Sequence, residues 1–284
     1  MKTKTLIPFL TFTFGLTWGI AAILILFYDQ VAAIFGELNS TNPLYILAVY
    51  SPGIVGILLV WRHYGLKGLG SFLRRLTLWR MPRVWWLFLL LGIPAIKYLS
   101  AALNGTIGEF PFSPWYLLLP ALAHAFFLGP IEEFGWRGIA QPLLQRKLAP
   151  IWAGLILGII TAVWHIPAFL LGGGLVYSSW SALPFFAGVI ALSVILTPLF
   201  NSSRGSLLIA YLYHFQMMNP IIPDAQPWEN LLFVLVAVVI VVLNRRTMFK
   251  KGSGVTEVLL PERDSEITYM VDETADNSLS AAAG

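Results

Sequence analysis

The sequence has no cysteine and few charged residues. The absence of cysteine among 284 residues excludes disulfide bonds, thiolate nucleophiles and cysteine-bound metals. Charged residues make up only 11% of the chain, whereas a soluble globular protein carries roughly 25%. Hydrophobic residues make up 57%, and the mean hydropathy is +0.75. The shortage of charge argues against a soluble domain and predicts an all-α, polytopic transmembrane helix bundle.

Apolar runs long enough to cross roughly 30 Å of hydrocarbon occur about eight times. The predicted spans are residues 6–27, 43–61, 84–103, 116–145, 151–171, 181–200, 206–219 and 230–244. The first run is too long for a signal peptide and lacks a small-residue cleavage pattern, so it is interpreted as an anchor. No internal repeat is visible, which disfavours an inverted-repeat transporter. Residues 1–251 are therefore predicted to form one transmembrane domain.

The charges between these spans are divided by sign. The basic loops and ends carry Lys2, Lys4, Arg62, Lys67, Arg74, Arg75, Arg80, Arg83, Arg146, Lys147, Arg204, Arg245, Arg246, Lys250 and Lys251. The loops on the other side carry only acidic residues, which are Asp29, Glu37, Glu109, Asp224 and Glu229. The positive-inside rule then predicts that both termini are cytoplasmic. Because the basic residues report topology, the expected partner is the lipid bilayer and no nucleic acid.

The last segment, residues 252–284, differs in composition from the rest. It carries seven acidic residues, many small residues and no apolar periodicity. Such a segment cannot bury enough apolar surface to fold alone. It is predicted to be a disordered, acidic cytoplasmic tail.

The stretch GPIEEFGWRG, residues 129–138, places two glutamates and an arginine in an apolar span. Glu132 lies about 14 residues before the basic pair at 146–147, roughly 21 Å into the membrane at 1.5 Å per residue. The same count puts His165 roughly 22 Å and His214 roughly 15 Å from the basic end. Ionisable groups at such a depth are costly and usually face a protein interior or a wet cavity. These side chains from three helices are therefore predicted to converge on one cavity.

The spacing within the stretch assigns different tasks to the two glutamates. Glu133 and Arg137 are four residues apart and share a helix face, so the arginine keeps that carboxylate ionised and oriented. Glu132 points about 100° away and is free to meet other helices. A carboxylate beside histidines in a low-dielectric cavity is a plausible general base for water. Pro167, two residues after His165, is expected to bend its helix where it lines the cavity.

Simpler interpretations stay open for single residues. Glu133 and Arg137 also fit a buried structural pair, and a membrane histidine often serves only as an interhelical hydrogen-bonding group. His124 is interpreted in that way and is left out of the candidate site. Lys97 lies near the outer end of its span and is expected to extend to the membrane surface. Two glutamates and two deep histidines on three helices are harder to explain together by structure alone.

Three motifs, taken in order, resemble those of the CPBP family. They are EEFGWR from residue 132, WHIP from residue 164 and YHFQMMNP from residue 213. That family comprises CAAX-processing endopeptidases and bacteriocin-processing or self-immunity proteins, also called Abi. The resemblance covers roughly residues 115–225, and the number of spans is compatible with it elsewhere.

The resemblance implies a glutamate-dependent intramembrane endopeptidase, often described as a metalloprotease. Carried over by position, Glu132 would be the base that activates water, assisted by His165. Glu133 and Arg137 would hold the site together. His214 and an amide neighbour would stabilise the oxyanion of the tetrahedral intermediate.

Two positions depart from the family pattern. The second motif usually has phenylalanine four residues before its histidine, where this chain has Thr161. The third usually has asparagine or aspartate four residues after its histidine, where this chain has Met218. Asn219 follows at five residues, about 140° round an ideal helix from His214. That angle counts against an oxyanion role for Asn219.

The residues leave the question of a metal open. Glu132, His165 and His214 are a familiar type of zinc-ligand set, but no HExxH pair fixes them locally. A zinc-bound water and a metal-free glutamate and histidine pair would use the same side chains. A divalent metal such as zinc and a metal-free mechanism are both kept as expectations.

Other functions compete with the protease. No HExxH, no GxSxG element and no aspartate within a span supports another class of membrane protease. The main alternative is a non-catalytic immunity or binding protein of the same fold, which Met218 favours. A proton-coupled transporter that uses the carboxylates is a second alternative. The expected setting is a bacterial plasma membrane, with a peptide or membrane-protein substrate that the residues do not name.

Overall fold

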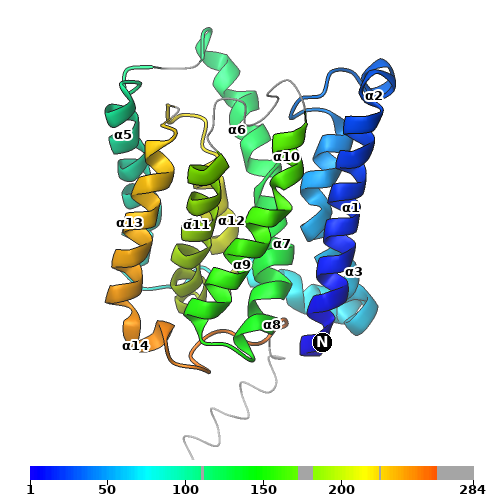
Figure 1. Ribbon diagram of the computed structural model, residues 1–284. Coiled ribbons are helices and arrows are strands. Elements are labelled where there is room, and N and C mark those ends of the chain that lie inside the picture. The colour runs from blue at the N-terminus through cyan, green and yellow to red at the C-terminus, as the bar shows by residue number, and fades with distance from the viewer. Residues whose placement is uncertain (110–111, 172–181, 224, 261–284) are drawn as a thin grey trace, which may run out of the picture.

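The described part of the protein is a bundle of helices, which confirms the predicted all-α class (Figure 1). The computed structural model describes residues 1–109, 112–171, 182–223 and 225–260, and these ranges contain no strand. In chain order the elements are η1 (Thr3–Thr5), α1 (Leu6–Leu26), α2 (Tyr28–Phe35), α3 (Pro43–Leu73), η2 (Arg74–Thr77), α4 (Arg83–Leu87), η3 (Phe88–Gly92), α5 (Ile93–Asn104), η4 (Trp115–Leu117), α6 (Leu118–Phe127), η5 (Pro130–Glu132), α7 (Glu133–Gly135), η6 (Trp136–Ala140), α8 (Gln141–Gln145), α9 (Pro150–Trp164), α10 (Ile166–Leu170), α11 (Ala182–Ser202), α12 (Leu207–Met217), α13 (Trp228–Leu243) and α14 (Arg245–Met248). The elements η3 and η6 are π-helical turns within longer helices.

Six helices of the described chain are long and apolar enough to cross a membrane. They are Thr3–Leu26, Pro43–Thr77, Arg83–Asn104, Trp115–Gln145, Pro150–Leu170 and Ala182–Ser202. The eighth predicted span corresponds to α13, an apolar helix of 16 residues. The seventh corresponds to α12, which has 11 residues and so extends about 16 Å at 1.5 Å per residue. The protein is therefore a multi-pass membrane protein with one helix that reaches only partway through.

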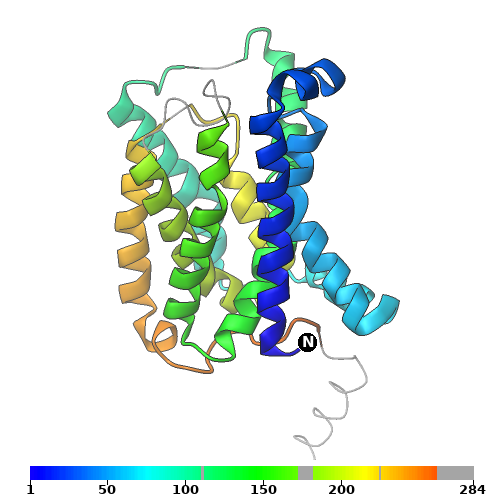
Figure 2. The ribbon, with the colours of Figure 1, turned by 45° about the vertical axis from the view of Figure 1, so that its right-hand side comes forward.

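The short helix α12 lies inside the bundle (Figures 1 and 2). It packs against α5, η5, α7 and α11, and none of its residues is exposed. Ser206 caps its first turn, because the Ser206 hydroxyl accepts a hydrogen bond from the Ile209 N–H at 3.0 Å. A helix of this length inside a membrane protein needs protein on every side, and the neighbours of α12 provide it.

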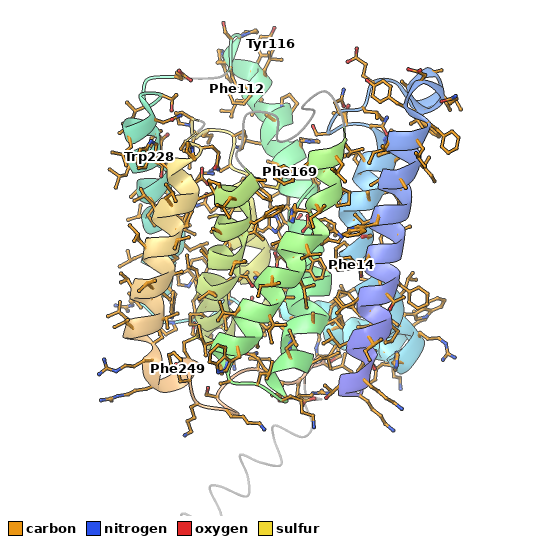
Figure 3. The ribbon with its side chains drawn as sticks, in the orientation of Figure 1. Phe14, Phe112, Tyr116, Phe169, Trp228 and Phe249 are labelled. Atoms are coloured by element: carbon orange, nitrogen blue, oxygen red, sulfur yellow. The ribbon has the colours of Figure 1, made fainter. Side chains whose placement is uncertain are left out.

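The chain ends of the described part lie at one end of the bundle (Figure 1). The N-terminus and α14 are at the lower end in this view, whereas α2 and the start of α6 are at the upper end. Aromatic side chains mark both ends, with Phe249 at the lower end and Tyr116 at the upper end (Figure 3). Which end faces the cytoplasm stays a prediction from the charges. Asp224, which contributed to that prediction, lies outside the described residues.

Glycines bring α3 unusually close to the segment that holds the two glutamates. A Cβ at Gly135 would overlap the carbonyl oxygen of Pro52, and a Cβ at Gly56 would lie 3.1 Å from the Gly135 Cα. A Cβ at Gly53 would lie 2.5 Å from the carbonyl oxygen of Ile131. Small residues allow two membrane helices to approach at backbone distance. The position of Glu132 and Glu133 is therefore set by backbone contact with a transmembrane helix.

The chain after α14 crosses the lower end of the bundle and packs against it (Figure 2). Arg146 donates hydrogen bonds to the carbonyl oxygens of Met1 at 2.6 Å and Thr256 at 2.8 Å. Val258 is buried. The tail from residue 252 onward was predicted to be mostly disordered, and its residues 252–260 find polar partners and an apolar site on the bundle. Residues 261–284 lie outside the described residues.

Arg75 joins this segment to the glutamate helix. The prediction placed it in a basic loop, but its exposed fraction is 1%. Its guanidinium donates to the carbonyl oxygens of Gly205 at 2.8 Å, Gly138 at 3.0 Å and Val258 at 3.0 Å. One buried side chain therefore satisfies three separate parts of the backbone, which composition alone does not reveal.

We expect Arg75→Met to lower the thermal stability of the protein strongly. The methionine keeps much of the apolar stem but leaves three buried carbonyl groups without their donor, at about 1–3 kcal/mol each. The measurement is the unfolding temperature of the purified protein in detergent. Arg62→Met is the matched control, because Arg62 is exposed. Equal unfolding temperatures for the two variants would show that Arg75 does not hold the lower end together.

Candidate functional site

A break in the fourth long helix precedes the two glutamates. Helix α6 ends at Phe127, and the 3-10 turn η5 begins at Pro130, because proline removes a backbone donor and cannot continue the helix. The break frees carbonyl oxygens that two tyrosines satisfy. Tyr50 of α3 donates to the Phe127 carbonyl at 2.8 Å, and Tyr211 of α12 donates to the Phe126 carbonyl at 2.5 Å. The break is therefore fixed from two sides.

Glu132 is buried and lies at the end of the turn η5. Its Oε2 accepts a hydrogen bond from the indole N–H of Trp136 at 3.2 Å. Trp136 starts the π-helical turn η6, a local widening that is frequent at functional sites. The indole holds one oxygen of the carboxylate and has no charge to neutralise it. Glu132 is therefore oriented by a neutral donor.

Glu133 is the centre of a charged network. Its Oε1 accepts a hydrogen bond from His214 Nδ1 at 2.8 Å, and its Oε2 lies 3.4 Å from a terminal nitrogen of Arg137. The other terminal nitrogen of Arg137 donates to the Ser193 hydroxyl of α11 at 3.1 Å, and Ser193 donates to the Gly154 carbonyl of α9 at 2.9 Å. The predicted pairing of Glu133 with Arg137 is present, and the network ties four helices to one carboxylate.

His165 lies between α9 and α10, at the bend expected from Pro167. Its Nδ1 is 2.8 Å from the Thr161 carbonyl oxygen. A carbonyl only accepts, so Nδ1 carries the proton and Nε2 presents a lone pair when the ring is neutral. The rings of Trp164, at 4.7 Å, and Phe185, at 5.3 Å between centroids, enclose the imidazole. The ring is thereby fixed with a defined acceptor.

Gly129 allows His214 to approach the glutamate turn. A Cβ at this position would overlap the sulfur of Met218 and would lie 2.8 Å from His214 Nε2. Any larger residue would therefore push the imidazole away. The Gly-Pro dipeptide before the glutamates has two separate purposes, since the proline breaks the helix and the glycine makes room for the histidine.

All six predicted site residues line one cavity of about 600 Å³. They are Glu132, Glu133, Arg137, His165, His214 and Asn219. Most of the remaining lining is apolar and comes from α1, α3, α6, α9, α10, α11, α12 and α13, with Thr17, Tyr45 and Asn230 among the polar exceptions. The predicted convergence on a single cavity is therefore seen in the structure. The roles of these residues stay predictions.

Asn219 follows the end of α12, and its amide is used locally. Its Nδ2 donates to Gln216 Oε1 at 3.0 Å, and its Oδ1 accepts from the Ile221 N–H at 3.2 Å. These bonds shape the turn after the helix. Met218, which stands at the family's amide position, places its sulfur beside Gly129.

Sequence reasoning missed three residues around the site. His124 was left out, but it lines the cavity, and its Nε2 is buried without a hydrogen-bond partner in the described structure. Trp136 holds Glu132, and its spacing of four residues was a signal that could have found it. Lys97 was expected at the membrane surface, but its side chain is buried and pairs with Glu229 at 3.4 Å. The lysine side chain is long enough to reach either the membrane surface or the protein interior, and the buried carboxylate of Glu229 decides for the interior.

Glu132, His165 and His214 are the candidate metal ligands. Among the described residues, no group of three or more His, Asp or Glu side chains is placed to hold a metal ion. His214 instead gives its Nδ1 to Glu133. A zinc-bound water and a metal-free mechanism both stay predictions.

Comparison with known proteins agrees with the motifs. Residues 114–218 match the family described as type II CAAX prenyl endopeptidase, Rce1-like. The chain is also similar to CAAX prenyl protease 2 of Methanococcus maripaludis, with 29% identity over 185 residues. That alignment covers 60% of this chain and 65% of the relative, which is slightly less than two thirds of its length.

Proposed function

We propose that this chain, whose residues 114–218 match the Rce1-like CAAX prenyl endopeptidase family, is an intramembrane endopeptidase. The observation that carries the proposal is the shared cavity in which Glu132, His165 and His214 meet from three helices. Burying two carboxylates and two imidazoles in an apolar cavity is costly. Hydrolysis of a peptide bond needs a base, a bound water and an oxyanion donor, and these groups can supply all three.

Glu132 would act as the base. Its carboxylate takes a proton from a water molecule, and the resulting hydroxide adds to the carbonyl carbon of the scissile peptide bond. His165 orients the water, because its Nδ1 proton is held by Thr161 and its Nε2 can accept a hydrogen bond from that water. The carbonyl carbon becomes tetrahedral and its oxygen becomes negative.

His214 would stabilise that oxyanion through Nε2. Its Nδ1 donates to Glu133, and the negative carboxylate offsets the charge of a ring that donates from both nitrogens. Glu133 is held in turn by Arg137, so the donor is oriented before the substrate arrives, as oxyanion stabilisation requires. When the intermediate collapses, the carbon–nitrogen bond breaks and the proton held by Glu132 passes to the leaving amine.

The substrate would be a peptide or membrane protein that enters from the bilayer. The relative from Methanococcus maripaludis carries the name of a CAAX prenyl protease, so a peptide ending in a prenylated cysteine motif is the first substrate to test. The large apolar part of the cavity lining supports a substrate with an apolar segment near the cleaved bond. The same peptide without its prenyl group tests whether the lipid is needed.

Cleavage of an internally quenched peptide by the purified protein tests the proposal. The prenylated and unmodified peptides are incubated with protein in detergent, and mass spectrometry identifies the products. A parallel incubation with a metal chelator, and one with added zinc, decide between the two mechanisms kept open above. Binding of either peptide without any cleavage would favour the immunity or binding protein. Proton-linked uptake by vesicles carrying the protein would favour the transporter.

We expect His214→Gln and Asn219→Ala to differ sharply in cleavage rate. Loss of an oxyanion donor costs about 10²–10³-fold in kcat, which is the expected effect at His214. Asn219→Ala is expected to keep most of the activity, because the Asn219 amide already bonds to Gln216 and Ile221. The measurement is kcat for each variant on the quenched peptide. A similar loss of about 10²-fold in both would place Asn219 in the oxyanion site despite its angle.

A further inference from the structure

The end of α12 that carries His214 is held by a helix outside the matched residues. Lys97 of α5 donates a hydrogen bond from Nζ to the carbonyl oxygen of Met217 at 2.6 Å. The exposed fraction of Lys97 is 5%, so this contact is inside the protein. Met217 is the last residue of α12, three residues after His214. The family match starts at residue 114, so Lys97 is not part of it.

The hydrogen bond from Lys97 satisfies a backbone carbonyl at the C-terminal end of α12. The last carbonyl groups of a helix lack partners within it, and an unpaired carbonyl is costly where no bulk water reaches it. A cation at a helix C-terminus also interacts favourably with the helix dipole. Lys97 therefore supplies a donor and a positive charge at the last turn of α12, which also carries His214.

Glu229 of α13 compensates the charge of Lys97. Its Oε1 lies 3.4 Å from Lys97 Nζ, and Glu229 is itself buried and lines the cavity. Helices α5 and α13 pack against each other, so the pair rests on a rigid base. A buried lysine without such a partner would be strongly unfavourable.

The same long helix holds α12 at a second point. The amide of Gln216 donates to the Leu89 carbonyl oxygen at 3.1 Å, and Leu89 lies in the π-helical turn η3. A π-turn presents backbone carbonyls outside the regular hydrogen-bond pattern. Gln216 also accepts from Asn219 at 3.0 Å. Helix Arg83–Asn104 therefore contacts the last turn of α12 through Leu89 and Lys97.

We infer that Lys97, supported by Glu229, is a positioning residue for the cleavage reaction: it fixes the end of α12 and so the place of His214. The inference rests on the proposed function. It adds that cleavage needs helices outside the matched residues 114–218, because α5, which supplies Lys97, precedes them and α13, which supplies Glu229, follows them. Neither side chain is given a chemical step.

The test compares Lys97→Met with Lys97→Arg and with Lys67→Met. Lys67 is exposed and provides the control for loss of one positive charge. For Lys97→Met we expect kcat on the quenched prenylated peptide to fall about 10–10²-fold, as for a misplaced catalytic group, with KM changed less than about twofold. Lys97→Arg keeps a donor and a charge, and should restore part of kcat. Lys67→Met should match the unmodified protein.

A second readout follows His214 directly. The chain has four histidines, so ¹⁵N-histidine NMR with His214→Gln as the assignment variant isolates its ring signals. We expect the Nδ1 signal of His214 to shift in Lys97→Met and to stay in place in Lys67→Met. Unchanged kcat and unchanged His214 signals, together with a lower unfolding temperature, would overturn the inference and leave Lys97 a purely structural role.

A double variant covers the case in which Lys97→Met does not fold because Glu229 is left unpaired. Lys97→Met with Glu229→Gln removes both charges and still deprives the Met217 carbonyl of its donor. The same loss of kcat is expected, and activity equal to the unmodified protein would overturn the inference. If the unmodified protein cleaves neither peptide, the proposed function fails, and the NMR comparison alone decides whether Lys97 positions His214.

Discussion

Glu132→Gln is expected to abolish peptide cleavage and leave the fold intact. The amide has the shape of the carboxylate and can still accept the hydrogen bond from Trp136, but it cannot take a proton from water. Loss of a positioned base costs about 10²–10⁴-fold in rate. No ion pair with Glu132 is seen in the described structure, so removing the charge of Glu132 leaves no buried cation without its partner. The unfolding temperature should therefore stay the same or rise.

The measurements are kcat on the quenched peptide and thermal unfolding in detergent. Glu109→Gln is the matched control, because Glu109 is exposed. Neither variant should unfold at a lower temperature than the unmodified protein, and only Glu132→Gln should lose activity. Full activity of Glu132→Gln would refute its role as the base and favour the non-catalytic alternative.

Arg137→Ala is expected to lower both stability and activity. The change leaves Glu133 buried without its cation and removes the donor to Ser193. Breaking a buried ion pair by deleting one partner costs about 3–5 kcal/mol. His214 still faces Glu133, but the Glu133 carboxylate no longer has Arg137 to connect it to Ser193 of α11. Both the unfolding temperature and kcat should fall.

A double variant separates the two effects. Arg137→Met with Glu133→Gln removes both charges, so most of the stability should return. Activity should not return, because His214 then lacks a carboxylate at Nδ1. Arg246→Ala, at an exposed arginine, controls for loss of positive charge. Recovery of activity in the double variant would show that the pair is only structural and would remove Glu133 from the proposed oxyanion site.

The sequence alone determined the class of the protein and the composition of its site. A long apolar segment in a membrane satisfies its backbone hydrogen bonds by forming a helix. Most span positions therefore followed directly from the apolar runs. The site followed because an ionisable residue at membrane depth is rare enough to stand out. The spacing of Glu133 and Arg137 also fixed their pairing, since four residues place two side chains on one helix face.

Only the tertiary structure decided which partner each charged group found. His214 of α12 bonds to Glu133 of α7, and a pairing between two helices depends on packing that the local sequence does not encode. Arg75 and Lys97 were assigned to loops and surfaces by their charge, yet both are buried, because each long side chain reaches backbone carbonyls of other segments. The packed segment 252–260 has the same cause. Its sequence, GSGVTEVLL, has no apolar periodicity that predicts a packed element, and only the assembled bundle offers Arg75, Gln145 and Arg146 as its partners.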